Sequence, residues 1–356
     1  MAGNRRTAGL TKSRFGVVAF VGRPNAGKST LLNRILGQKV SIVSEKPQTT
    51  RNRIVGILND PRGQIAILDT PGIHKPLHKL NVRMMDHVRS SLAEADVVAL
   101  IVDATESFGR GDEFAIGLLR EGAPSPAAEP ALSGAEGRHP LPQAGEGLRE
   151  PSPRVSGERV ALSGAKDRVR GPKRIAILNK IDQLRKEKLL PMMQRYGVTE
   201  LFDEIVPVSA INGEGVDELV NLLFQIVAPR EPLYSREDFT TQPERFFAAE
   251  IVREKLLQHT GEELPYTTAV AVERWEEEEE KNLIKIYATI VVERESQKPI
   301  VIGKRGDMVK RIGTESRLEL ESILGAKVFL DLHVAVHERW RDDPRFLGEL
   351  EWPLGE

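Results

Sequence analysis

The sequence of 356 residues contains no cysteine, which excludes disulfide bonds and thiolate metal sites. No apolar run approaches the ~18 residues of a membrane span, and residues 1–14 are polar and basic, so a secretory signal peptide is not expected. The formal net charge is −1, so a nucleic-acid partner has to be inferred from local basic patches. These absences predict a cytoplasmic protein whose membrane contact, if there is any, is peripheral.

The length of the chain and the pattern of its apolar runs predict two domains joined by a linker. Residues 15–230 alternate short β-rich runs with helical stretches, as in an α/β domain with a doubly wound, largely parallel sheet. Helical stretches are expected after Lys28, Leu80, Asp112, Lys186 and Val216. The expected strands are Val17–Val21, Ile54–Leu58, Gln64–Leu68, Val97–Val102, Ile175–Leu178 and Ile205–Val208.

One segment inside this domain, residues 121–172, departs from the alternation. Of its 52 residues, 16 are Pro or Gly, only seven are Leu or Val, and none is Ile or Phe. The five residues from Ala131 recur from Ala161, as in an inserted repeat element. Such a composition cannot bury a core, so the segment is expected to be disordered. It joins a helix to a strand, and such loops lie at the edge of a doubly wound sheet away from the ligand.

Residues 231–243 contain two prolines, Pro232 and Pro243, and are expected to form the linker. Residues 244–342 then follow a helix, strand, strand, helix pair, strand order, which predicts a small α+β domain, and residues 343–356 form a C-terminal tail. The acidic run Glu276–Glu280 falls between two of these strands and is expected to be a solvated hairpin loop.

A phosphate-binding loop is expected directly after the first strand. The pattern Gly22-x-x-x-x-Gly27-Lys28-Ser29 follows an apolar strand and precedes a helix, which is the context that this motif requires. Its glycines let backbone N–H groups close around phosphates, Lys28 reaches the β and γ oxygens, and the Ser29 hydroxyl ligates Mg²⁺. Binding of a nucleoside triphosphate is therefore predicted.

Two further segments predict that the base is guanine. Asn179-Lys180-Ile181-Asp182 follows the strand Ile175–Leu178, where the Asp182 carboxylate can accept from the two N–H donors of guanine. Asn179 is expected to hydrogen-bond the other edge of the base, and the Lys180 stem to cover its face. Ser209-Ala210 ends the next strand and is expected to give backbone support at the guanine O6.

Asp69-Thr70-Pro71-Gly72 ends another strand and is expected to be the nucleotide-sensing switch. Asp69 would reach Mg²⁺ through water, and the Gly72 amide would sense the γ-phosphate. Thr50 is the expected second hydroxyl ligand of Mg²⁺, with Thr49 the weaker candidate. The predicted nucleotide-binding residues are Gly22, Arg23, Pro24, Asn25, Ala26, Gly27, Lys28, Ser29, Thr30, Asp69, Thr70, Pro71, Gly72, Asn179, Lys180, Asp182, Ser209 and Ala210.

Ile73 occupies the position at which other GTPases carry a glutamine that orients the attacking water. An isoleucine side chain cannot hydrogen-bond water, so hydrolysis of GTP to GDP is expected to be slow without help. His74 and His78 flank Pro76, which breaks helical spacing, so they are interpreted as switch-loop residues and not as metal ligands.

A second loop, Gly303-Lys304-Arg305-Gly306, precedes a predicted helix in the C-terminal domain. A Gly-x-x-Gly loop of this kind clamps a single-stranded nucleic-acid backbone, because its glycines permit close approach and basic side chains offset phosphate charge. Between Gly303 and Arg317 there are five basic residues and two acidic ones, so this stretch is locally basic. The predicted RNA-binding residues are Gly303, Lys304, Arg305, Gly306, Lys310 and Arg311.

Together these motifs resemble the Era family of bacterial GTPases, whose members have an N-terminal GTP-binding domain and a C-terminal type II KH domain. The resemblance rests on the segments already quoted and on residues 46–51, 292–295 and 340–345. It implies binding to the 3′ end of 16S rRNA, help in assembly of the small ribosomal subunit, and peripheral association with the inner face of the cell membrane. We expect a monomer.

The resemblance also implies a role for potassium. Asn25 matches an asparagine that in related GTPases helps to hold K⁺ in place of an arginine finger, which would compensate for Ile73. We therefore expect Lys28, Thr50, Gly72 and Asn25 to act in catalysis, with Ser29, Thr50 and Asp69 at Mg²⁺ and Asn25 at K⁺. The insert at residues 121–172 is absent from the family.

Two alternatives remain at this point. One is a different RNA-linked GTPase, serving tRNA modification or the large ribosomal subunit. Such relatives tend to carry two GTP-binding domains or a cysteine-bearing site, whereas this chain has one phosphate-binding loop and no cysteine. The other is an RNA-binding switch whose hydrolysis is incidental.

Overall fold

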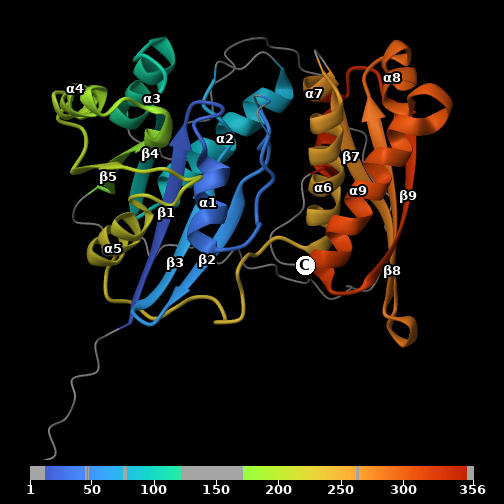
Figure 1. The fold of residues 1–356 in the computed structure, drawn as a ribbon, viewed down its shortest axis with the longest axis horizontal. Helices are drawn as coiled ribbons and strands as arrows, with labels where there is room; N and C mark the ends of the chain where they lie inside the picture. Colours follow the sequence, from blue (N-terminus) through green and yellow to red (C-terminus); the bar gives the residue numbers. More distant parts are fainter. Residues whose placement is uncertain are drawn as a thin grey trace, which may run out of the picture.

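The computed structural model describes residues 13–44, 46, 48–74, 78–121, 171–261 and 264–350. The chain forms two sheets, each with its own helices, which lie side by side (Figure 1). The predictions for the basic arm at residues 1–14 and for the insert at residues 121–172 fall almost entirely on residues 1–12 and 122–170. These lie outside the described residues.

The first sheet has six strands in the order β2-β3-β1-β4-β5-β6. All neighbouring pairs are parallel except β2 with β3, which are antiparallel. All six predicted strands are present, and most extend one to three residues further because ladder pairing continues past the apolar run. The strands are β1 (Arg14–Gly22), β2 (Ile54–Asp60), β3 (Gly63–Asp69), β4 (Val97–Asp103), β5 (Lys173–Asn179) and β6 (Glu204–Pro207).

Helices cover both faces of this sheet, as expected for a doubly wound fold. Along β1, Val18 and Phe20 pack against α1 and α5, whereas Ala19 and Val21 face the core shared with α2, α3 and α4. The five helices begin close to the predicted points. They are α1 (Lys28–Leu36), α2 (Lys79–Glu94), α3 (Arg110–Glu121), α4 (Lys186–Gly197) and α5 (Val216–Ile226).

The second sheet has three strands in the order β7-β8-β9, with β7 and β8 antiparallel and β8 and β9 parallel. Alternate residues of β8, such as Ile286 and Ile290, face helices α6 and α9. The elements are α6 (Glu244–His259), α7 (Leu264–Thr267), β7 (Thr268–Glu278), β8 (Leu283–Val292), α8 (Lys298–Ile302), α9 (Asp307–Leu324) and β9 (Lys327–Val336).

The acidic run Glu276–Glu280 was predicted to be a loop, and this is wrong for its first three residues. β7 continues to Glu278, and the turn is a short 3₁₀ helix at Glu279–Lys281. The extension is stabilised by cross-strand charge pairing, since Glu276 lies opposite Lys285 and the Glu278 carboxylate pairs with Lys281 and Lys285.

The predicted linker, residues 231–243, lies against the first domain. The Ile57 amide donates to the Phe239 carbonyl at 2.8 Å, and the Tyr234 ring packs on Phe15 with centroids 6.4 Å apart. After β9, the 3₁₀ helix Trp340–Asp342 and the short helix α10 (Pro344–Glu349) turn back toward α2. Trp340 and Leu347 share one buried cluster with Leu80. Among the described residues, no helix is both long enough and apolar enough to cross a bilayer.

Candidate nucleotide-binding and RNA-binding sites

The predicted phosphate-binding loop follows β1 and leads into α1. Gly27 has a φ of 89°, and a Cβ there would lie 2.3 Å from Nδ2 of Asn179, so only glycine fits without a shift. The Lys28 ammonium donates to the carbonyls of Gly22 and Arg23 at 3.2 and 2.9 Å. Burial lowers the pKa of Lys28 to about 8, and the nearby Asp69 partly opposes this effect. The Lys28 ammonium therefore binds the backbone of the phosphate-binding loop itself. Phosphate oxygens of a nucleotide could replace the two carbonyls as its hydrogen-bond acceptors.

The three predicted Mg²⁺ ligands lie together in this structure. The Ser29 hydroxyl donates to Asp69 Oδ2 at 2.6 Å and is 2.9 Å from the Thr50 hydroxyl. Asp69 is fully buried, and its Oδ1 has no hydrogen-bond partner in the described part of the chain. Burial raises the pKa of Asp69, while Lys28, Ser29 and Ser41 act in the opposite direction. Two hydroxyls and a carboxylate with an unpartnered oxygen are the hard oxygen donors that Mg²⁺ prefers, so this set fits the ion.

The hydroxyl groups of Thr50 and Thr49, the two candidate Mg²⁺ ligands, have different partners in the structure. The Thr49 hydroxyl donates to the Lys46 carbonyl at 2.6 Å, away from the cluster around Asp69. Sequence reasoning missed Ser41, whose hydroxyl donates to Asp69 Oδ2 at 3.0 Å. The backbone around Ser41 is held by Asn33, whose Oδ1 accepts from the amides of Val40 and Ser41. No local motif marks this contact.

The switch segment after β3 packs on the phosphate-binding loop. A Cβ on Gly72 would lie 2.7 Å from Cα of Pro24, and the Ile73 amide donates to the Gly22 carbonyl at 2.9 Å. The Thr70 hydroxyl donates to the Phe20 carbonyl at 2.7 Å. The Ile73 side chain is 3% exposed and lies in the core with Val21, so it has no access to a water at the nucleotide.

The two switch histidines contact protein groups. His74 Nδ1 lies 2.7 Å from the Gly72 carbonyl, and His78 Nδ1 lies 3.5 Å from Asp342 of the second domain. Within the described part of the chain, no three His, Cys, Asp or Glu side chains are grouped closely enough to hold a metal.

The predicted guanine-recognition residues meet at the carboxyl edge of β5. Asp182 is exposed, and its Oδ1 accepts from the Ser209 hydroxyl at 2.6 Å, which orients the carboxylate. Lys180 has a φ of 67°, and its ammonium lies 2.5 Å from Asp103 Oδ2, which holds the aliphatic stem in place.

Asn179 has a position that the sequence did not indicate. It is 1% exposed, its Nδ2 donates to the Ala26 carbonyl at 2.9 Å, and its Oδ1 accepts from the Ala210 amide at 3.0 Å. The side chain therefore links the phosphate-binding loop to the Ser209-Ala210 segment. The Ala210 amide, which was expected near the guanine O6, donates to Asn179 in this structure.

Two other residues of the phosphate-binding loop, Arg23 and Asn25, lie in different surroundings. The Arg23 guanidinium pairs with Glu106 and with Asp112 at the start of α3, at 2.7 and 3.2 Å, so its charge is engaged there. Asn25 is exposed at the tip of the loop with a φ of 62°.

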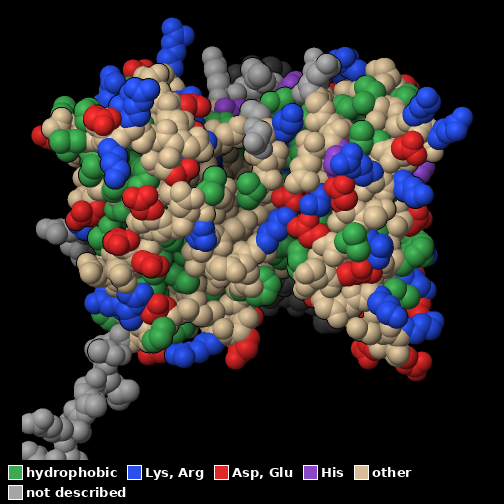
Figure 2. Space-filling view, in the orientation of Figure 1, with side chains coloured by type: hydrophobic (Ala, Val, Ile, Leu, Met, Phe, Trp, Pro, Cys, Tyr) green, Lys and Arg blue, Asp and Glu red, His purple; other side chains and the backbone are tan. Residues whose placement is uncertain are grey.

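The Gly-x-x-Gly segment forms the tight turn between α8 and α9. Gly303 has a φ of 75°, and a Cβ there would lie 2.6 Å from Met308 Cβ, whereas Gly306, with a φ of 82°, has open space around it. Lys304 and Arg305 are exposed. Basic side chains project at the end of the second domain where α8 lies (Figures 1 and 2). Lys310 is exposed as well, and Arg311 pairs with Glu315 at 3.0 Å.

Contacts between the two domains converge on the residues that flank Thr50. The Arg51 guanidinium donates to the carbonyls of Thr268 and Pro265 at 2.6 and 2.8 Å, and Arg253 donates to the Thr49 carbonyl. Earlier in the same segment, the Val43 amide donates to the Glu254 carboxylate at 2.9 Å. Sequence reasoning did not identify these contacts, because they join residues more than 200 positions apart.

Comparisons with known proteins agree with this geometry. The model of a family described as 50S ribosome-binding GTPase matches residues 17–129, and a KH domain model matches residues 263–341. A GTPase Era from Geobacter sp. (strain M21) is 45% identical over 95% of this chain and 97% of its own length. A GTPase Era from Syntrophus aciditrophicus (strain SB) is 40% identical over 97% of this chain and 98% of its own.

Two solved structures resemble the whole chain. One is a crystal structure of Era in complex with MgGDPNP and nucleotides 1506–1542 of 16S ribosomal RNA, with a TM-score of 0.78. The other is a single-residue variant of Aquifex aeolicus Era bound to GDP.AlF4⁻, with a TM-score of 0.77. Each is 35% identical and covers 95% of this chain and 98% of its own. The chain therefore belongs to the Era family of GTPases.

Proposed function

We propose that this protein is a GTP-controlled RNA-binding switch that binds the 3′ end of 16S rRNA and assists assembly of the small ribosomal subunit. The observation that carries the proposal is that one chain combines a guanine-nucleotide site with a basic Gly-x-x-Gly loop. A relative that is 35% identical over 95% of the chain was crystallised with nucleotides 1506–1542 of 16S rRNA, which supports this RNA.

In the proposed complex, Gly303 and Gly306 let the RNA backbone approach the turn before α9. Lys304, Arg305 and Lys310 offset phosphate charge, and Arg311 joins them once its pairing with Glu315 yields to RNA. Contacts of this kind make affinity strongly dependent on salt concentration.

At the nucleotide, Lys28 holds the β and γ phosphate oxygens, Asp182 selects guanine, and the Gly72 amide senses the γ-phosphate. Ser29 and Thr50 would supply hydroxyl oxygens to Mg²⁺, and Asp69 would reach the ion through a water molecule. When bound, Mg²⁺ neutralises charge that develops on the β and γ oxygens. Asn179 holds the phosphate-binding loop against the Ser209-Ala210 segment.

The RNA-binding role is tested by Gly306→Asp in the full chain. An added Cβ meets none of the described atoms within 4 Å, although the φ of 82° makes any side chain there strained, and the carboxylate would repel RNA phosphate. The matched control is Gly325→Asp, at the other end of α9, where φ is 64° and the space is also open. We expect at least a tenfold loss of affinity for a 3′ 16S rRNA fragment in Gly306→Asp and less than twofold in the control. Equal affinities would overturn the assignment.

Slow hydrolysis with help from potassium is the second part of the proposal, with Asn25 as a K⁺ ligand. Ile73 lies in the core, so no side chain at that position can orient water. We expect kcat well below 1 s⁻¹ in sodium buffer and a clear rise in potassium. The same rate in the two salts would exclude this role for Asn25.

We further propose that the protein acts in the cytoplasm as a monomer and associates peripherally with the inner face of the cell membrane. Fractionation before and after a high-salt wash, and light scattering of the purified chain, test these two points. An integral membrane fraction or a stable dimer would contradict them.

A further inference from the structure

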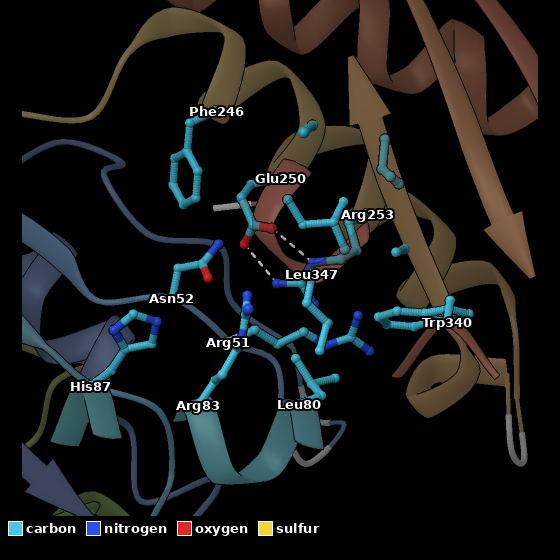
Figure 3. A pocket seen from close by; sticks show the side chains of 14 residues that line it. Arg51, Asn52, Leu80, Arg83, His87, Phe246, Glu250, Arg253, Trp340 and Leu347 are labelled. Carbon is cyan, nitrogen blue, oxygen red and sulfur yellow. Dashed lines mark hydrogen bonds and ion pairs between the residues drawn. The ribbon is translucent and has the colours of Figure 1, made fainter. Parts of the chain in front are cut away.

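A small cavity of ≈ 40 Å³ lies between the two domains, apart from the nucleotide site and from the Gly-x-x-Gly loop. Its wall on the first domain comes from α2 and the segment after Thr50, and its wall on the second from α6, β7 and Trp340. Charged and polar side chains from both sides face one another there (Figure 3). Among them are Arg51, Asn52, Glu250 and Arg253.

Arg51 is a buried cation in this wall whose hydrogen-bond partners are neutral. It is 8% exposed, its two terminal nitrogens donate to backbone carbonyls, and its guanidinium lies 5.5 Å from the centre of the Trp340 ring. Its Nε has no hydrogen-bond partner, and no ion pair joins Arg51 to a carboxylate of the described residues. A buried charge without a counter-ion is costly, so this arrangement favours a nearby anion.

Arg253 approaches from the opposite domain and is 3% exposed. Its Nε and Nη2 donate to the two oxygens of Glu250 at 2.8 and 2.6 Å, and its Nη1 has no hydrogen-bond partner within the residues that the structure describes. Both Glu250 oxygens are thus used by Arg253. The cavity wall thus holds three guanidinium groups, those of Arg51, Arg83 and Arg253, and one carboxylate, Glu250. Among the described residues, Arg51 Nε and Arg253 Nη1 have no hydrogen-bond partner.

The field inside the cavity is correspondingly positive. A single water needs ~10–15 Å³ on this volume scale, so the cavity has room for about three waters or one tetrahedral oxyanion.

We propose that the cavity binds a small tetrahedral oxyanion carrying phosphate chemistry, held by the guanidinium groups of Arg51 and Arg253. The source is either inorganic phosphate, which hydrolysis of GTP releases, or the phosphate group of a small metabolite. Because Arg51 follows Thr50 and Arg253 contacts the Thr49 carbonyl, the anion ties the Thr50 segment to the second domain. It therefore stabilises this arrangement of the two domains.

Binding is tested by calorimetry on the full chain saturated with Mg²⁺ and GDPNP, so that phosphate cannot occupy the nucleotide site. Phosphate is titrated against chloride at equal ionic strength. We expect one saturable phosphate site. Glycerol 3-phosphate is the second titrant: binding of phosphate alone identifies the free ion as the ligand, and binding of both identifies a metabolite phosphate. Absence of a saturable site for either titrant would overturn the proposal.

The variant for this site is Arg253→Met with Glu250→Gln, which removes the cation together with its carboxylate partner and leaves no unpaired buried charge. Lys39→Met is the matched control, because Lys39 also joins the domains, through Glu254 and Glu319, but does not line the cavity. We expect at least a tenfold loss of phosphate affinity in the double variant and less than twofold in the control. Equal losses would mean that loosening of the domain interface alone explains the effect, and the proposal would fail.

A measurement on the unmodified protein covers the case in which the double variant does not fold. Crystals soaked in selenate, a tetrahedral dianion with an anomalous signal, should show a peak within hydrogen-bond distance of Arg51 and Arg253. A map with selenate bound elsewhere and no peak in this cavity would exclude the site.

Discussion

At the scale of single residues, Ile73 shows how one side chain limits the chemistry. Its neighbour Gly72 packs against Pro24 of the phosphate-binding loop, while the Ile73 side chain points into the core with Val21 and Met85. The position cannot orient an attacking water even if a polar residue is placed there, because the side chain points away from the nucleotide.

Ile73→Gln is therefore expected to lower stability without raising the rate of hydrolysis. Burying an amide in this apolar cluster, with loss of packing, costs about 2–4 kcal/mol, or roughly 5–10 °C in melting temperature. Thermal unfolding and single-turnover hydrolysis measure the two effects, with Ile73→Val as the matched control of nearly normal stability and rate. A rise of tenfold or more in kcat for Ile73→Gln would show that the side chain reaches the nucleotide.

The motif residues could be predicted from sequence because each motif is a short local pattern tied to a strand end. Ser29, Thr50 and Asp69 were expected together, and the Ser29 hydroxyl lies within hydrogen-bond distance of both Thr50 and Asp69. Ser41 and the linking position of Asn179 could not be predicted, since their partners are set by how loops far apart in the chain meet. Motifs indicate which side chains act on the ligand, but the residues that hold them are fixed by tertiary packing.

At the scale of elements, the strands were predictable because their apolar runs are continuous or strictly alternating. The acidic end of β7 was not, because composition alone favoured a loop and the pairing of Glu278 with Lys281 and Lys285 depends on the register with β8. A comparable cluster of charges joins α9 to the first domain. The Glu319 carboxylate there pairs with Lys255 of α6, at 2.5 Å, and with Lys39.

This cluster predicts a pH-dependent contribution to stability. Burial by itself raises the pKa of Glu319, but hydrogen bonds from Lys255 and Lys39 outweigh it and keep the pKa below the usual 4.5. The folded state thus holds the proton less tightly than the unfolded state. The resulting stabilisation is complete above pH 4.5 and is lost as the pH falls through the lowered value.

Lys39→Met should remove part of this stabilisation. We expect about 0.5–1 kcal/mol at pH 7, because solvent screens the partly exposed pair with Glu319, while the buried Glu254, which Lys39 also contacts, keeps Lys255 as a partner. The melting temperature should fall by roughly 1–2 °C at pH 7, and the difference from the parent should shrink below pH 4.5. A difference that stays constant down to pH 3.5 would rule out titration of Glu319 as its origin.

At the scale of the whole molecule, the two domains share a buried interface that no sequence motif predicted. Trp340 and Leu347, from the end of the chain, pack on Leu80 of α2, and Arg51 reaches the backbone of the second domain. The sequence indicated two domains with separate tasks. The structure adds that Arg51 and the Thr49 carbonyl, on either side of the proposed Mg²⁺ ligand Thr50, are hydrogen-bonded to the second domain.

The position of the insert relative to this architecture leads to the last prediction. α3 ends at Glu121 and β5 begins at Lys173, which pairs with Val97 at the amino end of β4. The phosphate-binding loop instead follows Gly22, which pairs with Ile101 near the carboxyl end of β4. Residues 122–171 therefore join the fold at the edge of the sheet opposite the nucleotide site.

Replacing residues 122–171 with a four-residue Gly-Ser linker should leave kcat/KM for GTP within about twofold of the parent value, since both attachment points lie at the edge of the sheet opposite the proposed nucleotide site. Shortening the connection reduces the entropy cost of closing it by about 2 kcal/mol, so the melting temperature should rise by a few degrees. Hydrolysis assays, thermal unfolding and ribosome profiles of cells carrying the shortened chain measure these effects. If activity fell tenfold while the melting temperature rose, the insert would have a role at the nucleotide site that its place of attachment does not explain.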